Sequence, residues 1–290
     1  MFLALGDSTK KLIAILLVSL MLVIIGYTFW HQAPYSTTVA ATVIRVTGST
    51  TVFPLGTACA EAFNGNQSVY RVSVGQGGTG AGITDLGEGR SDIAMASREV
   101  TSDEKTKYGN NFQENLIGYD GIAVCVSNAI YNAGVTSLTK DQVKKIYAGN
   151  ITNWKELGGP NDAIYIISRE QGSGTRDSFL TDIFGSTKAE TPAVSTYSSS
   201  NAEIYKAITG SDKAIGYLGY SYTQRGDIKA VKIEGVEVNP QTIKDKTYPL
   251  ARKLYLDTLG DPKPGAKVFI EFCKGPEGQK IASENGFVPL

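Results

Sequence analysis

Residues 163–184 read AIYIISREQGSGTRDSFLTDIF, and the order of patterns in them indicates the fold class. It begins with an apolar run over 163–168 that is typical of a buried strand. A loop rich in Gly, Ser and Thr follows, and apolar residues at helical spacing between Phe179 and Phe184 then predict a helix. A strand, a polar loop and a helix in this order form one unit of an α/β fold.

Two earlier stretches repeat this unit. Strand-like residues 42–47 lead into Gly48-Ser-Thr-Thr51 and a helical pattern, and strand-like residues 69–74 lead into a glycine-rich loop over 75–80 and a helix over about 81–87. Further strands are predicted at 92–96, 115–126, 214–218 and 248–256, and further helices at 139–148, 268–273 and 279–283. This alternation predicts an α/β fold with mostly parallel sheets, in which 115–126 is long enough to cross between two lobes.

The N-terminus carries an uncharged stretch of nineteen residues, Leu12 to Trp30, preceded by Lys10 and Lys11. Its length and its basic flank predict a membrane anchor over residues 1–30, a tether over 31–41 and an extracytoplasmic globular part. A cleaved signal peptide is the alternative, because Val39-Ala40-Ala41 suits a signal peptidase, although the apolar core of such peptides is usually about 7–15 residues.

The charge balance excludes one class of partner. The chain has 28 Lys and Arg against 28 Asp and Glu, which leaves no excess positive charge for binding nucleic acid. Residues 1–41 hold Lys10, Lys11 and Asp7, so the rest of the chain has 26 basic and 27 acidic residues. An anion site there must rely on local groups rather than on a basic surface.

Histidine and cysteine usage argues against catalysis and metal binding. The single histidine, His31, lies in the predicted tether, so the globular part lacks the commonest general base and metal ligand. The cysteines at 59, 125 and 273 are far apart and include no Cys-x-x-Cys pair, which excludes a disulfide framework and a four-cysteine zinc site. We therefore expect no enzyme, no cofactor and no metal.

Each of the three Gly/Ser/Thr loops precedes a predicted helix. Helix N-termini have unpaired amide donors and partial positive charge, and hydroxyl side chains add further donors, so each loop is a potential anion site. The alternative for any one loop is an ordinary N-cap and an ordinary turn. Three such loops, one of them following Arg169, favour convergence on a small tetrahedral oxyanion.

Two rival interpretations of the loops are weaker. Gly75, Gly77 and Gly80 match the G-x-G-x-x-G dinucleotide pattern, but the expected acidic residue about 20 positions further on is not clearly placed. Ser173 suggests a serine hydrolase, but Gly172-Ser-Gly-Thr is not the nucleophile elbow of that class, and no histidine is present to activate the hydroxyl.

Several stretches resemble the phosphate-binding proteins of phosphate ABC importers, in order over about residues 44–290. They are TGSTTVFP at 47–54, GGTG at 77–80, DIAMASR at 92–98, IYAGNITNW at 146–154, REQGSGT at 169–175, AIGY at 214–217 and YPLAR at 248–252. The resemblance implies an α/β, two-lobed, periplasmic-binding-protein-like (type II) fold with two crossover strands. Lobe 1 would comprise 42–120 and 248–290, and lobe 2 would comprise 121–247. It further implies capture of inorganic phosphate in the cleft and delivery to ABC transporter permease subunits.

The resemblance also implies a set of phosphate-binding residues. From lobe 1 these are Thr50, Thr51, the Val52 amide and Thr79, and from lobe 2 they are Arg169, Ser173, Gly174 and Thr175.

One position departs from the family pattern. The family often has Ser-Asp after the Asp-Ile strand, and its aspartate accepts the proton of phosphate, whereas this chain has Ser97-Arg98. Asp120 is our candidate replacement, with a turn or capping carboxylate as the alternative. Arg98 is expected either to add a second positive contact or to pair with a nearby carboxylate. A binder of another oxyanion, a phosphate sensor and an extracytoplasmic hydrolase stay open as functions.

Overall fold

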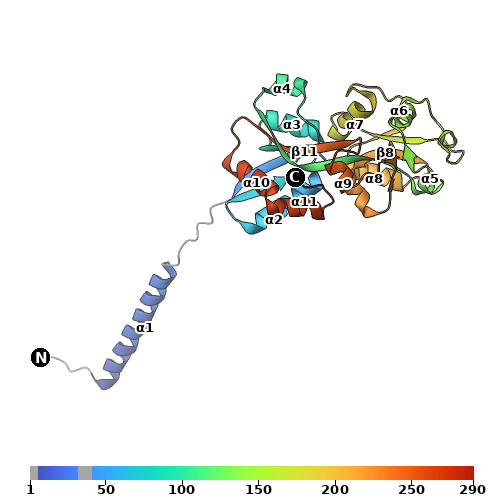
Figure 1. Ribbon diagram of the computed structural model, residues 1–290. Helices are drawn as coiled ribbons and strands as arrows, with labels where there is room; N and C mark the ends of the chain where they lie inside the picture. The colour runs from blue at the N-terminus through green and yellow to red at the C-terminus, as the bar shows by residue number, and fades with distance from the viewer. Residues whose placement is uncertain (1–5, 32–40) are drawn as a thin grey trace. The chain divides into compact units, whose positions relative to one another are not determined.

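The computed structural model describes residues 6–31 and 41–290, without the side chains of residues 28–31. Residues 41–290 form one unit (Figure 1), and the N-terminal helix α1 (Asp7–His31) precedes it in the chain. Within α1, the span Asp7–Tyr27 has a mean hydropathy of 2.2, and it is the one helix of the described residues that is long and apolar enough to cross a membrane. A signal sequence near an N-terminus has the same properties, so the choice between anchor and signal peptide stays a prediction.

Helix α1 ends at His31, the first residue of the predicted tether. The border predicted between anchor and tether at 30/31 stays a prediction. Residues 32–40, which hold most of the predicted tether and the first two residues of Val39-Ala40-Ala41, lie outside the described residues.

Strands and helices alternate through most of the globular unit. In chain order the elements are β1 (Thr42–Gly48), α2 (Phe53–Asn66), β2 (Tyr70–Val74), α3 (Thr79–Gly87), β3 (Ile93–Ala96), α4 (Ser102–Tyr108), β4 (Phe112–Val126), α5 (Asn128–Asn132), β5 (Ser137–Leu138), α6 (Lys140–Ala148), the 3₁₀ helix η1 (Trp154–Leu157), β6 (Tyr165–Arg169), α7 (Gly174–Phe184), β7 (Thr196–Ser198), α8 (Asn201–Thr209), β8 (Ala214–Gly219), the 3₁₀ helix η2 (Tyr220–Arg225), β9 (Lys229–Ala230), β10 (Lys232–Ile233), α9 (Pro240–Lys244), β11 (Ala251–Leu259), α10 (Pro264–Lys274) and α11 (Pro276–Glu284).

The main sheet is mixed rather than mostly parallel, which corrects the sequence-based prediction. Its strand order is β2-β1-β3-β11-β4-β8-β6-β7, with β9 also paired to β4, and β10 and β5 form a separate pair. The pairs β1–β2, β1–β3, β6–β8 and β6–β7 are parallel. The central strands β4 and β11 run antiparallel to each other and to their other neighbours, because the chain crosses the sheet in one direction along β4 and returns along β11.

Two large clusters of buried hydrophobic side chains make the fold two-lobed. The first cluster joins β1, β3, α2, α10 and α11 and includes Ile117 of β4 and Leu254 of β11. The second cluster joins β6, β8, α6, α7 and α8 and includes Ile122 of β4 and the adjoining Leu250. We call the parts of the chain around these two clusters lobe 1 and lobe 2. The borders predicted at 120/121 and 247/248 stay predictions.

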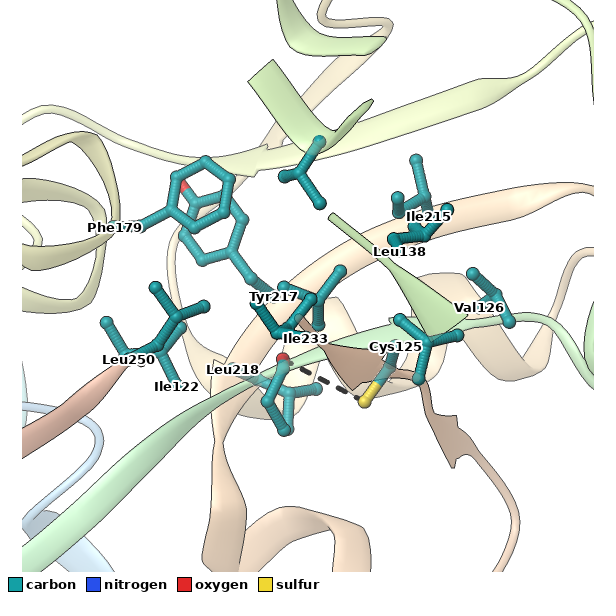
Figure 2. Close-up of a cluster of buried hydrophobic side chains, with 14 of the residues drawn as sticks. Ile122, Cys125, Val126, Leu138, Phe179, Ile215, Tyr217, Leu218, Ile233 and Leu250 are labelled. Atoms are coloured by element: carbon teal, nitrogen blue, oxygen red, sulfur yellow. Dashed lines mark hydrogen bonds between the residues drawn. The ribbon is translucent and has the colours of Figure 1, made fainter. Parts of the chain in front are cut away.

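Three aromatic rings pack together in the core of lobe 2. The rings of Phe179 and Tyr217 stack on each other (Figure 2). Their centroids are 3.9 Å apart. Tyr147 packs against both rings, and its hydroxyl donates a hydrogen bond to the Ile167 carbonyl. This packing fixes α7 against β6 and β8, so the first turn of α7 is held at a defined place above the sheet.

Helices cover both faces of lobe 1. In Figure 1, α2, α10 and α11 lie on one side of the strands and α3 and α4 on the other. A separate small cluster of Ile83, Leu86, Ala94 and Val100 packs under α3. Helices α2, α3 and α7 follow β1, β2 and β6, so their N-termini come at the carboxyl ends of parallel strands, where open α/β sheets bind ligands.

Candidate functional site

The loops of the two lobes meet at the N-termini of four helices: α2 and α3 of lobe 1, and α7 and α8 of lobe 2. Thr51, just before α2, and Thr175, in the first turn of α7, lie with their hydroxyl oxygens 2.9 Å apart, and both are buried. The Gly80 amide of α3 donates to the Gly172 carbonyl, also at 2.9 Å. The three Gly/Ser/Thr loops therefore converge, and they do so at helix ends that favour an anion.

Asn201, the first residue of α8, ties lobe 2 to the first loop. Its Nδ2 donates to Oγ1 of Thr50 at 3.1 Å and to Oγ1 of Thr51 at 2.9 Å, and its Oδ1 accepts from the Gly219 amide. The Tyr222 hydroxyl also donates to the Thr50 carbonyl at 3.1 Å. These bonds are buried, so they hold the two hydroxyls firmly in place.

The second loop contacts α7 so closely that only glycine fits. A Cβ at Gly174 would overlap with Thr79 Oγ1 and lie 2.7 Å from Ser97 Oγ. Thr79 Oγ1 accepts from the Ser97 amide at 3.2 Å, and the two hydroxyls are 3.3 Å apart. Ser173 caps α7, since its Oγ accepts from the Arg176 amide at 3.3 Å. The N-terminus of α7 is therefore packed directly against the first turn of α3.

Arg169 ends β6 and is almost completely buried, at 1% exposure. Its Nε and Nη2 donate to the two carboxylate oxygens of Glu170 at 2.9 and 2.8 Å, and also to the backbone carbonyls of Ser198 and Ser199. Its Nη1 has no hydrogen-bond partner among the described residues. A buried guanidinium donor without a partner is unfavourable by itself and is satisfied when an anion binds next to it.

Asp120 of β4 and Arg252 of β11 are opposite each other in the central strand pair. Arg252 donates to Asp120 Oδ2 from Nε at 3.0 Å and from Nη2 at 2.7 Å, and the Tyr220 amide donates to Oδ1 at 3.0 Å. Burial raises the pKa of Asp120, and the charge of Arg252 opposes this shift. Three donors on two oxygens are the environment of an ionised carboxylate, so this is a buried ion pair.

Arg98 is the predicted residue that the structure directs away from the loops. Its Nη1 and Nη2 donate to Glu104 at 2.9 and 2.8 Å, and its Nε donates to Asp177 of α7 at 2.8 Å. Burial disfavours the charged guanidinium, but Glu104 and Asp177 outweigh this and raise the pKa of Arg98. Of the two roles allowed by the sequence, the geometry matches pairing with carboxylates, here across the lobes, and we leave Arg98 out of the anion site.

The other predicted residues lie in this network or directly beside it in the chain: Thr50, Thr51, Val52, Thr79, Asp120, Arg169, Ser173, Gly174 and Thr175. Sequence reasoning missed Arg252, Asn201 and Ser97. Asn201 follows Ser198-Ser-Ser200, a fourth hydroxyl-rich loop before a helix, and this was a usable signal. The partnership of Arg252 with Asp120 links positions 132 residues apart and becomes visible only in the strand register.

Within residues 6–31 and 41–290, no group of three or more His, Cys, Asp or Glu side chains is placed to hold a metal ion. The candidate site is thus built from hydroxyls, amides, two arginines and one buried carboxylate. Such a set recognises an oxyanion through local donors, as the balanced charge of the chain requires.

Comparison with known proteins agrees with this geometry. The family model of the PBP superfamily domain matches residues 35–277. The phosphate-binding protein PstS of Bacillus subtilis (strain 168) is 31% identical over 249 residues, which cover 85% of this chain and 80% of that protein. PstS of Staphylococcus aureus (strain MRSA252) is 34% identical over 257 residues, covering 83% and 76%. The chain belongs to the phosphate-binding proteins of the PBP superfamily.

Solved structures of this family share the fold. A phosphate ABC transporter substrate-binding protein from Clostridium perfringens, solved with bound phosphate, is 36% identical, with a TM-score of 0.80, and the match covers 86% of this chain and all of that one. An ABC-type phosphate transport receptor from Vibrio cholerae is 30% identical, with a TM-score of 0.70, and the match covers 85% of this chain and all of that one. These matches confirm the predicted family and the two-lobed α/β fold. The family is one of substrate-binding transport proteins, so the prediction of a non-enzyme is also confirmed.

Proposed function

We propose that this chain captures inorganic phosphate in the cleft between its lobes and delivers it to the permease subunits of an ABC transporter. The relatives named above support the proposal, because two are named phosphate-binding proteins and the third was solved with bound phosphate. The observation that carries it is Arg169, a buried guanidinium whose Nη1 has no partner among the described residues. It stands at the start of the loop into α7 and bonds the loop into α8 through the Ser198 and Ser199 carbonyls. A tetrahedral dianion satisfies such donors better than a neutral or planar ligand of the same size.

The contacts follow from the convergence of the loops. Arg169 supplies a charge-assisted hydrogen bond, and the amides of the first turns of α2 and α7 supply further donors. The proposed ligand residues are Thr50, Thr51, the Val52 amide and Thr79 from lobe 1, and Arg169, Ser173, Gly174 and Thr175 from lobe 2. Since they come from both lobes, binding of phosphate stabilises the closed arrangement over an open one.

Asp120 is our proposal for the residue that distinguishes phosphate from sulfate. Phosphate bears a proton near neutral pH, and sulfate bears none. A buried carboxylate accepts a hydrogen bond from the protonated oxygen of phosphate, whereas it repels sulfate, whose oxygens are only acceptors. Arg252 holds Asp120 ionised and in place.

The cellular setting is part of the same proposal. Helix α1 places the globular unit outside the cytoplasm, either attached to the membrane as an anchor or released after cleavage. Closure of the lobes around phosphate creates a surface that an ABC permease recognises, since both lobes contribute to it only in the closed form.

The test is a titration of the purified full chain in mild detergent with phosphate, comparing the unaltered protein with Arg169→Met. The matched control is Arg71→Met, which removes an exposed arginine from strand β2. We expect tight binding by the unaltered chain and by the control, and at least about 100-fold weaker binding by Arg169→Met, because a charge-assisted bond and a buried cation are lost. Equal affinity of all three proteins would refute the assignment of Arg169.

A further inference from the structure

Arg252 has the same unusual feature as Arg169. Its side chain is 5% exposed, and while Nε and Nη2 bond Asp120, its Nη1 is buried and has no partner in the part of the chain that the structure describes. An ion pair with Asp120 alone does not explain this, because Arg252 presents a third, unused nitrogen inside the protein. A buried donor without an acceptor is costly and points to a ligand.

Arg252 also contacts the residue at which the loops of the two lobes meet. Its Nη2 donates to Thr51 Oγ1 at 3.1 Å, and the same oxygen lies 2.9 Å from Thr175 Oγ1 and accepts from Asn201 Nδ2. Two hydrogen bonds, both through Thr51 Oγ1, therefore link the guanidinium to Thr175 in the first turn of α7. A ligand held by Thr51 and Thr175 is within reach of its terminal nitrogens.

Two buried cations lie near each other at this point. Burial lowers the pKa of the Arg252 guanidinium, Asp120 opposes the shift, and the positive charge of Arg169 adds to it. Each arginine has one carboxylate partner, Asp120 for Arg252 and Glu170 for Arg169, and each keeps one Nη1 without a partner. An anion between two such groups is favourable, since its charge acts on both in a low-dielectric interior.

We infer that Arg252 is a second arginine that binds phosphate directly, with Nη1 as the donor. This rests on the proposed function, and it gives the β4–β11 strand pair, which joins the lobes, a direct part in holding the ligand. Asp120 then acts together with Arg252: it neutralises one side of the guanidinium, while the other side is directed at the anion. The competing explanation is that Arg252 is only the counter-ion of Asp120.

A pair of variants separates the two explanations. In Asp120→Asn the counter-ion role of Arg252 is already removed, so the informative comparison is between that variant and the double variant Asp120→Asn with Arg252→Met. We expect the full chain carrying both changes to bind phosphate about 30-fold more weakly than Asp120→Asn alone, because it loses a charge-assisted hydrogen bond. Equal or tighter binding by the double variant would overturn the inference.

The control is Lys253→Met, which removes a positive charge from the neighbouring residue of β11, where the side chain is 47% exposed and pairs with Glu99. Phosphate affinity within about twofold of the unaltered chain is expected, since exposed charges are screened. A fall as large as that of the double variant would assign the effect to overall charge and overturn the inference.

If the double variant does not fold, Arg252→Lys serves instead. Lysine keeps the charge that Asp120 needs but lacks the planar fork of arginine. If Arg252 contacts phosphate directly, Arg252→Lys should bind phosphate about tenfold more weakly. If Arg252 is only the counter-ion of Asp120, the phosphate affinity should not change. Failure of the unaltered chain to bind phosphate would refute the proposed function itself. Normal binding by the unaltered chain together with unchanged affinity of Arg252→Lys would refute only the role of Arg252.

Discussion

Replacing Arg98 by glutamine breaks an ion pair that joins the two lobes. Arg98 follows β3 in lobe 1, and its Nε bonds Asp177 of α7 in lobe 2 at 2.8 Å. Glu104 holds the other side of the guanidinium, and a further bond runs from Ser178 Oγ to the Ser97 carbonyl. The guanidinium is thus positioned by lobe 1 and bonds lobe 2, so it stabilises the closed arrangement that captures the ligand.

The size of the effect follows from the burial of the pair. The side chains of Arg98 and Asp177 are 11% and 15% exposed. An exposed pair contributes about 0.2–1 kcal/mol and a charged hydrogen bond out of water about 1.5–3 kcal/mol, so we take about 1.5 kcal/mol for this partly buried one. Since about 1.4 kcal/mol is a factor of ten, phosphate affinity should fall about tenfold in Arg98→Gln and in Asp177→Asn.

Stopped-flow release of phosphate is the assay. Because the pair forms when the lobes close, we expect the dissociation rate to rise about tenfold and the association rate to change little. The double variant should be no weaker than either single one, which gives a coupling of about 1.5 kcal/mol in the double-mutant cycle. If Arg98 instead contacted phosphate directly, Arg98→Gln would bind phosphate weakly and Asp177→Asn would bind it normally.

Two control variants keep the charge changes but spare the cleft. Arg90→Gln removes an arginine that pairs with Asp85 and Glu88 within lobe 1. Asp141→Asn removes an acidic residue from the first turn of α6, as Asp177→Asn does from α7. Both should bind and release phosphate normally. Unchanged release in Arg98→Gln and in Asp177→Asn would refute a role of the pair in closure.

Three further predictions concern single residues. Asp120→Asn should weaken phosphate binding about tenfold and reduce the rejection of sulfate, measured by titration with both anions; unchanged discrimination would remove Asp120 from the site. Gly174→Ala should lower phosphate affinity at least about tenfold, because the added Cβ overlaps with Thr79. The control Gly77→Ala should leave phosphate affinity unchanged, because its Cβ would lie 3.4 Å from the nearest atom. Equal effects of the two changes would contradict the close packing of the lobes. Burial raises the pKa of Asp257 well above its ordinary value, so the folded protein holds this proton to higher pH than the unfolded chain and loses stability as pH rises. Asp257→Asn should therefore gain more stability over the unaltered chain at pH 8 than at pH 4 in urea unfolding, and the same gain at both pH values would contradict this.

The repeated units were predictable because their signals are local. The helix predicted over 139–148 is α6, capped by Thr139 as its sequence indicates. Helix α4 has no buried residue and therefore no apolar spacing by which a sequence could reveal it. The strand predicted over 248–256 is displaced to Ala251–Leu259, because Pro249 has no amide to donate to a strand ladder and the Tyr248 amide instead donates to the Thr242 carbonyl.

The site was only partly predictable for a related reason. Loop composition and the resemblance pointed to Thr51, Thr79 and Ser173, whose roles depend on their own helix ends. The ion pair of Asp120 with Arg252 depends on which strands lie side by side in the sheet, and so does the direction of β4 against β11. Neither follows from hydrophobic periodicity, which identifies elements but not their partners.

Calorimetric titration of the full chain with phosphate and with sulfate, in separate experiments near neutral pH, measures whether the chain binds phosphate selectively. We predict one phosphate bound per chain and sulfate affinity about 100-fold lower, because the carboxylate of Asp120 accepts a hydrogen bond from the protonated oxygen of phosphate and repels sulfate. Absence of phosphate binding, or sulfate or molybdate binding as tight as phosphate, would contradict this prediction.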